Sequence, residues 1–274
     1  MEFCYQLSKS PPTYDFLIFL WYAEQTRKQY GKQSLQIRIV PGDRLRVERD
    51  LHFSEARKTW RAQHLLYDLA WLMPSVTDVS VSTQGIQTVR YNMPGLPMDR
   101  CLKSSAGATE CVKRFLSKHR NPVCIPIRHY DYQTDRNTIP SEWRKVVSWL
   151  KSNGYTPISV QDTEGLMAGV HCDIGAIDYY PASMSPDLRL ALYEQCVTNL
   201  ILNQGPAVLG LIGNADCFVF FEELPQIESC TRENLKKTGF FEDWGPGRRT
   251  IECSQRADDI IAHIEPRLSE AKAA

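Results

Sequence analysis

The second half of the chain alternates short apolar runs with longer segments of helical periodicity, and this rhythm restricts the fold more than any other feature. The runs that read as buried strands are residues 123–127, 156–160, 199–202 and 217–221. After the first run, one helical face repeats Trp143, Val146, Val147 and Leu150. Gly154 closes that helix, and a second amphipathic helix is expected over residues 187–200. Strands and helices in this order are typical of a doubly wound parallel sheet.

The first half has the same rhythm in a shorter form. We expect strands at 2–7, 35–40 and 76–83, a helix at 14–31, and a second helix that ends near Met73. The second helix repeats Leu65, Leu66, Leu69 and Leu72 at helical spacing, as a helix covering a sheet would. The sequence therefore predicts an α/β protein with two Rossmann-like, doubly wound parallel-sheet domains.

We place the division between these domains at residues 108 and 109, giving domains 1–108 and 109–274. Two segments suggest it, the Pro- and Gly-rich loop 92–98 and the small-residue stretch 103–109. The last helix could pack back on the N-terminal domain.

The overall charge gives no reason to expect nucleic acid as a partner. Lys and Arg together number 32, as do Asp and Glu, so no overall charge favours nucleic acid or acidic lipid.

The nine cysteines show no metal-like spacing and suggest reduced, buried thiols. The start of the chain lacks a secretion signal, and the most apolar window, residues 16–23, is too short to span a bilayer. We expect a cytoplasmic protein without a transmembrane segment, for which peripheral membrane contact stays open.

Polar loops directly follow three of the predicted strands. These loops span residues 128–137, 161–165 and 203–205. In open α/β sheets, ligands bind in the crevice beyond the carboxyl ends of the strands. The candidate site residues should therefore lie in these loops.

The turn at Asn203, Gln204, Gly205 and Pro206 has the features of an anion site. Glycine allows close backbone approach, proline suits the first helical positions, and free amides at a helix start attract an anion such as phosphate. An equally good alternative is structural, because a buried strand-to-helix turn can require Gly and Pro without any ligand.

The two other loops offer side chains for the same site. Arg128 and Arg136 share one loop, and guanidinium groups match phosphate oxygens well. Alternatively, they could pair with Asp131 and Asp135, which lie in the same loop.

In the loop that follows the strand at 156–160, we assign Gln161, Asp162 and Thr163 to a ribose or base. Asp162 or Glu164 could accept hydrogen bonds from hydroxyl groups, as an acidic residue after the second strand does in dinucleotide-binding folds. A solvated acidic turn is the commoner alternative.

Missing motifs narrow the chemistry. The sequence contains neither the dinucleotide fingerprint GxGxxG, nor the P-loop, nor the GxSxG elbow. It also lacks an Asp-x-Asp pair, with which many sugar transferases hold a metal. We therefore expect no metal and no cofactor, so that arginines and helix amides alone would neutralise a phosphate.

Three stretches of the second half resemble the nucleotide-sugar half of GT-B glycosyltransferases: IPIRHYDYQTDRN, GYTPISVQDTEG and LRLALYEQCVTNLILNQGPAVLGLIG. Within that fold, residues 120–270 are most similar to the ADP-heptosyltransferase and fucosyltransferase-like groups. The resemblance implies that residues 203–206 cradle the donor diphosphate and that Arg128 binds its phosphates. Heptosyltransferases carry an acidic residue before this glycine and a histidine after the turn. This chain has Asn203 and Gln204 before the glycine and Ala207 and Val208 after the turn, so the resemblance does not by itself imply heptose, and the diphosphate contact would rest more on backbone amides.

The resemblance implies a glycosyltransferase of polysaccharide biosynthesis that moves a sugar from a nucleotide-sugar co-substrate to a glycan or lipid-linked acceptor. The N-terminal domain would then hold the acceptor, and Asp15 would be the base by its position. Asp15 also suits a first helical turn without any catalytic role. Arg128 and Arg136 would stabilise the leaving diphosphate. The alternatives are a non-catalytic nucleotide-sugar-binding or scaffold protein and an enzyme like the UDP-sugar epimerases.

Overall fold

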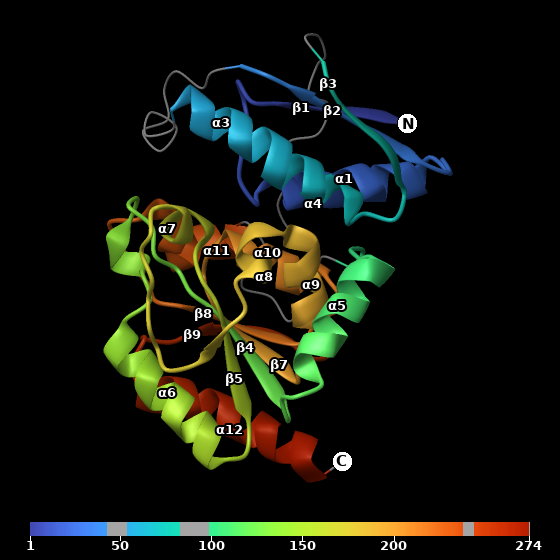
Figure 1. Ribbon diagram of the computed structural model, residues 1–274. Helices are drawn as coiled ribbons and strands as arrows, with labels where there is room; N and C mark the ends of the chain where they lie inside the picture. Colours follow the sequence, from blue (N-terminus) through green and yellow to red (C-terminus); the bar gives the residue numbers. More distant parts are fainter. Residues whose placement is uncertain (43–53, 83–98, 238–243, 274) are drawn as a thin grey trace.

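Two parallel β-sheets organise the computed structural model, which describes residues 1–42, 54–82, 99–237 and 244–273 (Figure 1). One sheet has three strands and the other has six, and helices lie between and around them. The predicted fold class, an α/β chain with two Rossmann-like parallel sheets, is confirmed.

The smaller sheet and its helices come from the first half of the chain. In chain order they are β1 (Glu2–Gln6), α1 (Phe16–Gln29), β2 (Leu35–Val40), α3 (Glu55–Arg61), the π-helical turn η1 (Ala62–Leu66), α4 (Tyr67–Trp71) and β3 (Val76–Val81). The strands pair in the order β1-β2-β3. The leucines predicted to cover the sheet, at 65, 66, 69 and 72, are all buried.

The larger sheet comes from the second half of the chain. Its strands are β4 (Pro122–Pro126), β5 (Thr156–Val160), β6 (Ile177–Asp178), β7 (Thr198–Leu202), β8 (Cys217–Phe221) and β9 (Arg248–Glu252). They pair in the order β6-β5-β4-β7-β8-β9, all parallel. The prediction missed β6 and β9, because one has two residues and the other is largely polar. Neither presents an apolar run.

Helices cover both faces of the larger sheet. They are α5 (Ala106–Leu116), α6 (Pro140–Ser152), α7 (Thr163–Met167), α8 (Pro181–Met184), α9 (Pro186–Gln195), α10 (Gly205–Ile212), α11 (Arg232–Lys237) and α12 (Ala257–Ala273), with short 3-10 turns η2 (Thr134–Arg136) and η3 (Glu228–Cys230). On one face, α9 and α10 share an apolar core with α1 and α4 of the first half. On the other face, α6 and α12 enclose a second core.

Two expectations about helices need correction. The last helix, α12, buries Ile260, Ile264 and Leu268 in the core beneath α6 instead of returning to the N-terminal sheet (Figure 1). Helix α9 ends at Gln195, because the chain from Thr198 onward forms β7. It is also not amphipathic. It lies between the two sheets and is therefore buried on most sides.

The division expected between residues 108 and 109 stays a prediction. Helix α5 runs across it, with Ser105 as the N-cap residue that accepts a hydrogen bond from the amide of Ala108. The loop 92–98, which also suggested a boundary, lies outside the described residues.

The strand order locates the crevice of the larger sheet. From β4 the chain proceeds through β5 to β6 on one side, whereas β7, β8 and β9 follow on the other side. The topological switch point therefore lies between β4 and β7, and ligands in such sheets bind beyond the carboxyl ends of the strands at that point. The loops that begin at Arg128 and Asn203 flank this position.

In the part of the chain that the structure describes, no helix combines the length and apolar character needed to cross a membrane.

Candidate functional site

A cleft of about 630 Å³ lies at the switch point, with walls from both halves of the chain. All predicted site residues except Gln161 line it: Asp15, Arg128, Arg136, Asp162, Thr163, Asn203, Gln204, Gly205 and Pro206. The carboxyl ends of β4, β5 and β7 thus bring together side chains that are far apart in the sequence.

Gln161 has a structural position instead. Its Nε2 donates to the carbonyl of Cys172 at 3.1 Å and to Oδ1 of Asp178 at 2.7 Å, and its Oε1 accepts from the amide of Cys172 at 3.1 Å. The side chain is buried and ties the end of β5 to the segment around β6. It does not reach the cleft.

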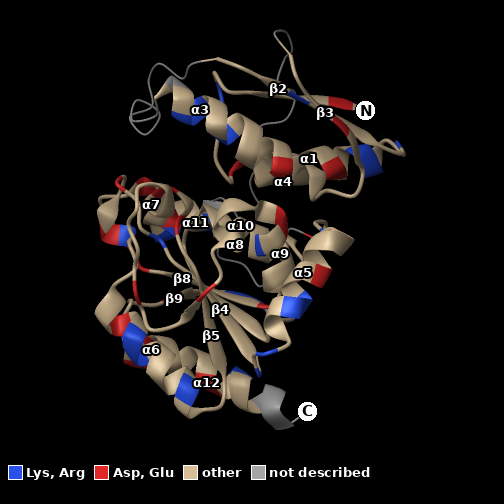
Figure 2. Ribbon diagram, in the orientation of Figure 1, with Lys and Arg blue, Asp and Glu red and all other residues tan. Residues whose placement is uncertain are grey.

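The start of α10 faces the cleft without a side-chain cap. Gln204 is the N-cap residue, but its Nε2 donates to the carbonyl of Pro126 at 3.2 Å, not to the helix. Pro206 occupies the first turn, as predicted. The helix contains no charged residue (Figure 2). Pro206 has no amide hydrogen and the amide of Ala207 donates to the carbonyl of Gln204 at 2.9 Å, so the helix dipole and the amide of Gly205 are the features of this turn that can attract an anion.

Tyr14 covers part of this turn from the N-terminal half. A Cβ built on Gly205 would lie 3.0 Å from Cβ and 3.1 Å from Cδ2 of Tyr14. Burial raises the pKa of the Tyr14 hydroxyl, so the phenol is neutral at physiological pH. Tyr14 is not among the predicted site residues, because an aromatic side chain next to a helix start usually belongs to the core.

Arg128 holds its own loop together. Its Nη1 donates to the carbonyl of Gln133 at 3.0 Å and to Oδ1 of Asn137, and its Nη2 donates to the carbonyl of Tyr132 at 2.7 Å. Among the described residues, no carboxylate lies within ion-pair distance, so Arg128 does not pair with Asp131 or Asp135. Burial, followed by the charge of a neighbouring arginine, lowers its pKa to about 10, and it stays protonated at neutral pH.

Arg136 bridges the switch point. It lies at the end of η2, and its Nη2 donates to the carbonyl of Asn203 while its Nη1 donates to Oε1 of Gln133 at 2.7 Å. One guanidinium group thus connects the loop after β4 to the turn after β7. It brings a positive charge to the start of α10.

Asp162 and Thr163 begin α7 at the end of β5. The carboxylate of Asp162 accepts from the amides of Glu164 at 3.0 Å and Gly165 at 3.2 Å, and therefore caps the helix. Burial raises its pKa although the surrounding arginines oppose this shift. The hydroxyl of Thr163 donates to the carbonyl of Ser183 at 2.6 Å.

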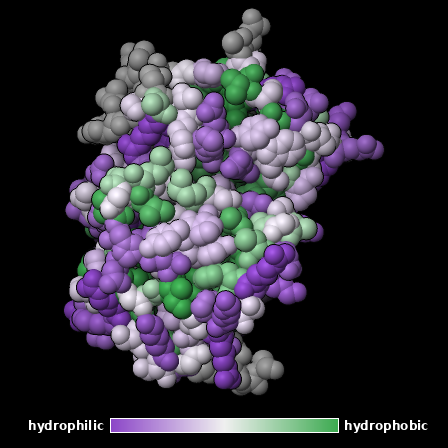
Figure 3. All heavy atoms as spheres, in the orientation of Figure 1, coloured by the Kyte–Doolittle hydropathy of each residue, from purple (hydrophilic) through white to green (hydrophobic). Residues whose placement is uncertain are grey.

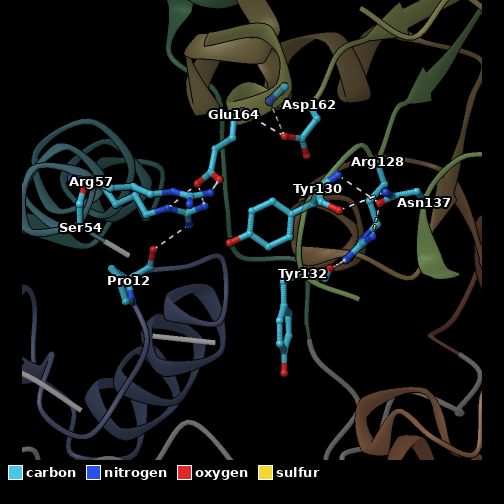
Figure 4. A network of polar contacts seen from close by, with 11 residues as sticks. Pro12, Ser54, Arg57, Arg128, Tyr130, Tyr132, Asn137, Asp162 and Glu164 are labelled. Atoms are coloured by element: carbon cyan, nitrogen blue, oxygen red, sulfur yellow. Dashed lines mark hydrogen bonds and ion pairs between the residues drawn. The ribbon is translucent and has the colours of Figure 1, made fainter. Parts of the chain in front are cut away.

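An ion-pair cluster, Arg57, Arg61 and Glu164, joins the two halves beside the cleft (Figure 4). The Nε of Arg61 lies 2.8 Å from Oε1 of Glu164, and its Nη1 donates to the carbonyl of Pro12 at 3.0 Å. Burial lowers the pKa of Arg61 to about 10. The ring of Tyr130 lies next to this cluster, with its centroid 5.5 Å from Cζ of Arg57.

Asp15 lies on the N-terminal wall of the cleft. It is the N-cap residue of α1 but makes no side-chain cap. Its Oδ2 accepts from the hydroxyl of Thr13 at 3.0 Å. The carboxylate therefore faces the cleft from the half of the chain that does not carry α10.

Apolar side chains accompany the charged ones at the rim. On the face shown in Figure 3, hydrophobic residues form separate patches between hydrophilic ones. Met184, which lines the cleft, is 41% exposed, and Met167 of α7 is 55% exposed.

Among the described residues, no group of three or more His, Cys, Asp or Glu side chains is arranged to hold a metal ion.

Solved structures with a similar fold include glycosyltransferases. A family 9 glycosyltransferase from Veillonella parvula has a TM-score of 0.51 at 10% identity, over 96% of this chain and 89% of that chain. The E. coli ADP-heptose lipopolysaccharide heptosyltransferase II has a TM-score of 0.51 at 11% identity, over 100% and 98% of the two chains. The E. coli heptosyltransferase WaaC with ADP has a TM-score of 0.50 at 10% identity, over 99% of each chain. The chain has their GT-B-like fold. No protein-family model and no curated protein matches the sequence.

Replacement of Glu164 should destabilise the protein, because it removes the ion pairs that join the two halves of the chain. Glu164→Gln leaves Arg61, whose side chain is 12% exposed, without its charged partner, so we expect the free energy of unfolding to fall by up to about 3 kcal/mol. Urea denaturation measures this change. Glu110→Gln removes an exposed pair with Arg114 and serves as the control, with a loss of about 0–1 kcal/mol. Equal losses for the two variants would contradict the bridging role of Glu164.

Proposed function

We propose that the protein is a metal-independent glycosyltransferase that moves a sugar from a nucleotide-sugar donor to a hydroxyl group of a glycan or lipid-linked acceptor. This proposal rests mainly on one contact: at the switch point, the guanidinium group of Arg136 lies next to the start of α10, which has no side-chain cap. A diphosphate bound there would receive hydrogen bonds from a guanidinium group and from the amide of Gly205, and it would lie at the positive end of the helix dipole. The GT-B-like fold supports the same assignment.

The donor would lie along the carboxyl ends of β4, β5 and β7. Its diphosphate would contact Gly205 and Arg136, and Arg128 would shape their loop while directing its remaining N–H groups toward a phosphate. Its nucleoside would lie near Asp162 and Thr163 at the end of β5. That the E. coli heptosyltransferase WaaC was solved with ADP supports a nucleoside diphosphate as the group to be bound.

Transfer would proceed by direct displacement. Asp15 would take the proton of the acceptor hydroxyl as the acceptor oxygen forms its bond to the anomeric carbon. The bond from that carbon to the diphosphate would break at the same time. The negative charge of the leaving diphosphate would be stabilised by Arg136, Arg128 and the amide of Gly205. A cytoplasmic site of action, peripheral membrane contact and a role in polysaccharide biosynthesis belong to this proposal.

Loss of the Arg136 charge should weaken donor binding. Arg136→Gln removes one charge-assisted hydrogen bond to phosphate, so we expect affinities for nucleoside diphosphates to fall about 10- to 100-fold. Calorimetric titration with ADP, GDP and UDP measures the change. Arg144→Gln is the matched control, because Arg144 is exposed on α6. Unchanged affinity in Arg136→Gln would refute the assigned role.

Loss of the base should separate binding from chemistry. Asp15→Asn should keep wild-type affinity for the nucleoside diphosphate and lose at least about 100-fold in transfer rate. Product analysis with a panel of nucleotide sugars measures transfer. Undiminished turnover would remove Asp15 from the mechanism. Binding without transfer or hydrolysis by the wild type would indicate a scaffold protein, and an epimerised donor would indicate an isomerase.

Chelation should leave the activity intact. The proposed site neutralises the diphosphate with arginines and amides, so transfer rates measured with and without EDTA should agree. Complete loss of transfer with EDTA, restored by a divalent cation, would overturn the metal-independent mechanism.

A further inference from the structure

Arg189 of α9 is a buried cation with an unused hydrogen-bond donor. Arg189 is 3% exposed and lines the cleft. The Nε donates to the carbonyl of Ala182 at 2.8 Å, but the Nη2 has no hydrogen-bond partner. Within the described part of the chain, no carboxylate lies within ion-pair distance of this guanidinium group.

Such a group is unexpected in this position. The other buried residues of α9 are mainly apolar, and buried charges in proteins are normally paired and hydrogen-bonded. A methionine or leucine would fill the same space without an unsatisfied donor. A partner from outside the chain would satisfy the Nη2 of Arg189.

A second unsatisfied group lies close by. The hydroxyl of Ser183 is buried without a hydrogen-bond partner, and Ser183 also lines the cleft. It is adjacent in sequence to Ala182, whose carbonyl accepts from Arg189. Helices α8 and α9 therefore bring two unsatisfied donors to one wall of the cleft.

One aromatic ring contacts both this wall and the start of α10. The Cζ of Arg189 lies 5.9 Å from the ring centroid of Tyr14. The same side chain packs closely against Gly205, because a Cβ there would lie 3.0 Å from Cβ and 3.1 Å from Cδ2 of Tyr14. Displacement of the Tyr14 ring would uncover the guanidinium group and the helix start together.

We propose that Arg189, Ser183 and the amide end of α10 form one anion-binding site for a phosphate group, and that the ring of Tyr14 covers it until the phosphate displaces the ring. The assignment of this phosphate to the donor rests on the proposed function.

Inorganic pyrophosphate tests the site without any choice of nucleoside or sugar. A ring that must leave before binding lowers the apparent affinity. Tyr14→Ala should therefore bind pyrophosphate about tenfold more tightly than the wild type in a calorimetric titration. Tyr180→Ala, which removes an exposed tyrosine outside the cleft, should bind as the wild type does.

The arginine is tested by Arg189→Met, alone and combined with Tyr14→Ala. We expect pyrophosphate affinity to fall at least about tenfold and the gain from Tyr14→Ala to disappear. The melting temperature without pyrophosphate should stay equal or rise, because an unsatisfied buried charge is removed. If the role of Arg189 were purely structural, its replacement by methionine would instead lower the melting temperature. Arg189→Lys keeps the charge without the planar fork and should bind with intermediate affinity, which provides a test if the methionine variant does not fold.

The outcomes separate this inference from the proposed function. Equal pyrophosphate affinity in the wild type, Tyr14→Ala and Arg189→Met, together with weak binding by Arg136→Gln, would overturn the covered site and leave the donor assignment standing. Absence of pyrophosphate binding in the wild type and all variants would overturn both.

Discussion

The site depends on the divergence of the chain at the adjacent strands β4 and β7. The segment after β4 leads to α6 on one face of the larger sheet, and the segment after β7 leads to α10 on the opposite face. Right-handed crossovers on both sides of the switch point enforce this separation. The gap that remains is bordered by backbone amides and loop side chains, and the cores on both faces hold it open.

The N-terminal half adds a second wall through two different kinds of contact. Apolar packing of α1 and α4 on α9 and α10 fixes one side, and the ion pairs of Arg57 and Arg61 with Glu164 fix the other. The apolar packing stabilises the contact by removing apolar surface from water and does not depend on precise orientation, whereas the ion pairs require a defined geometry. The cleft lies between these two contacts. Its shape therefore depends on both halves being in place.

The sequence predicts the parts of this arrangement that are governed by local pattern. Uninterrupted apolar runs located β4, β5, β7 and β8, and the rule that ligands bind at strand ends located Arg128, Arg136 and the turn at Gly205. Strand β6 could not be predicted, because a strand of two residues shows no periodic pattern of apolar side chains.

Other features depend on tertiary contacts that no local pattern encodes. The side chain of Gln161 follows a strand end, yet it turns away from the cleft to bind the segment around β6. Arg189 was hidden in a helix whose burial between two sheets overrides the usual polar face. Arg61 and Glu164 are distant in the sequence, and only the packing of the two halves brings them together. Composition could not distinguish these side chains from ordinary surface charges.

The close approach of Tyr14 to Gly205 also constrains how such a chain can diverge. Gly205 does not have a positive φ, so the backbone at position 205 would accept other amino acids, but a Cβ there would lie 3.0 Å from the Cβ and 3.1 Å from Cδ2 of Tyr14. Evolutionary replacement of this glycine would therefore require a change at position 14, or a shift of its backbone, in the other half of the molecule. The two positions are therefore expected to covary among homologous sequences, as an inherited trace of one steric contact.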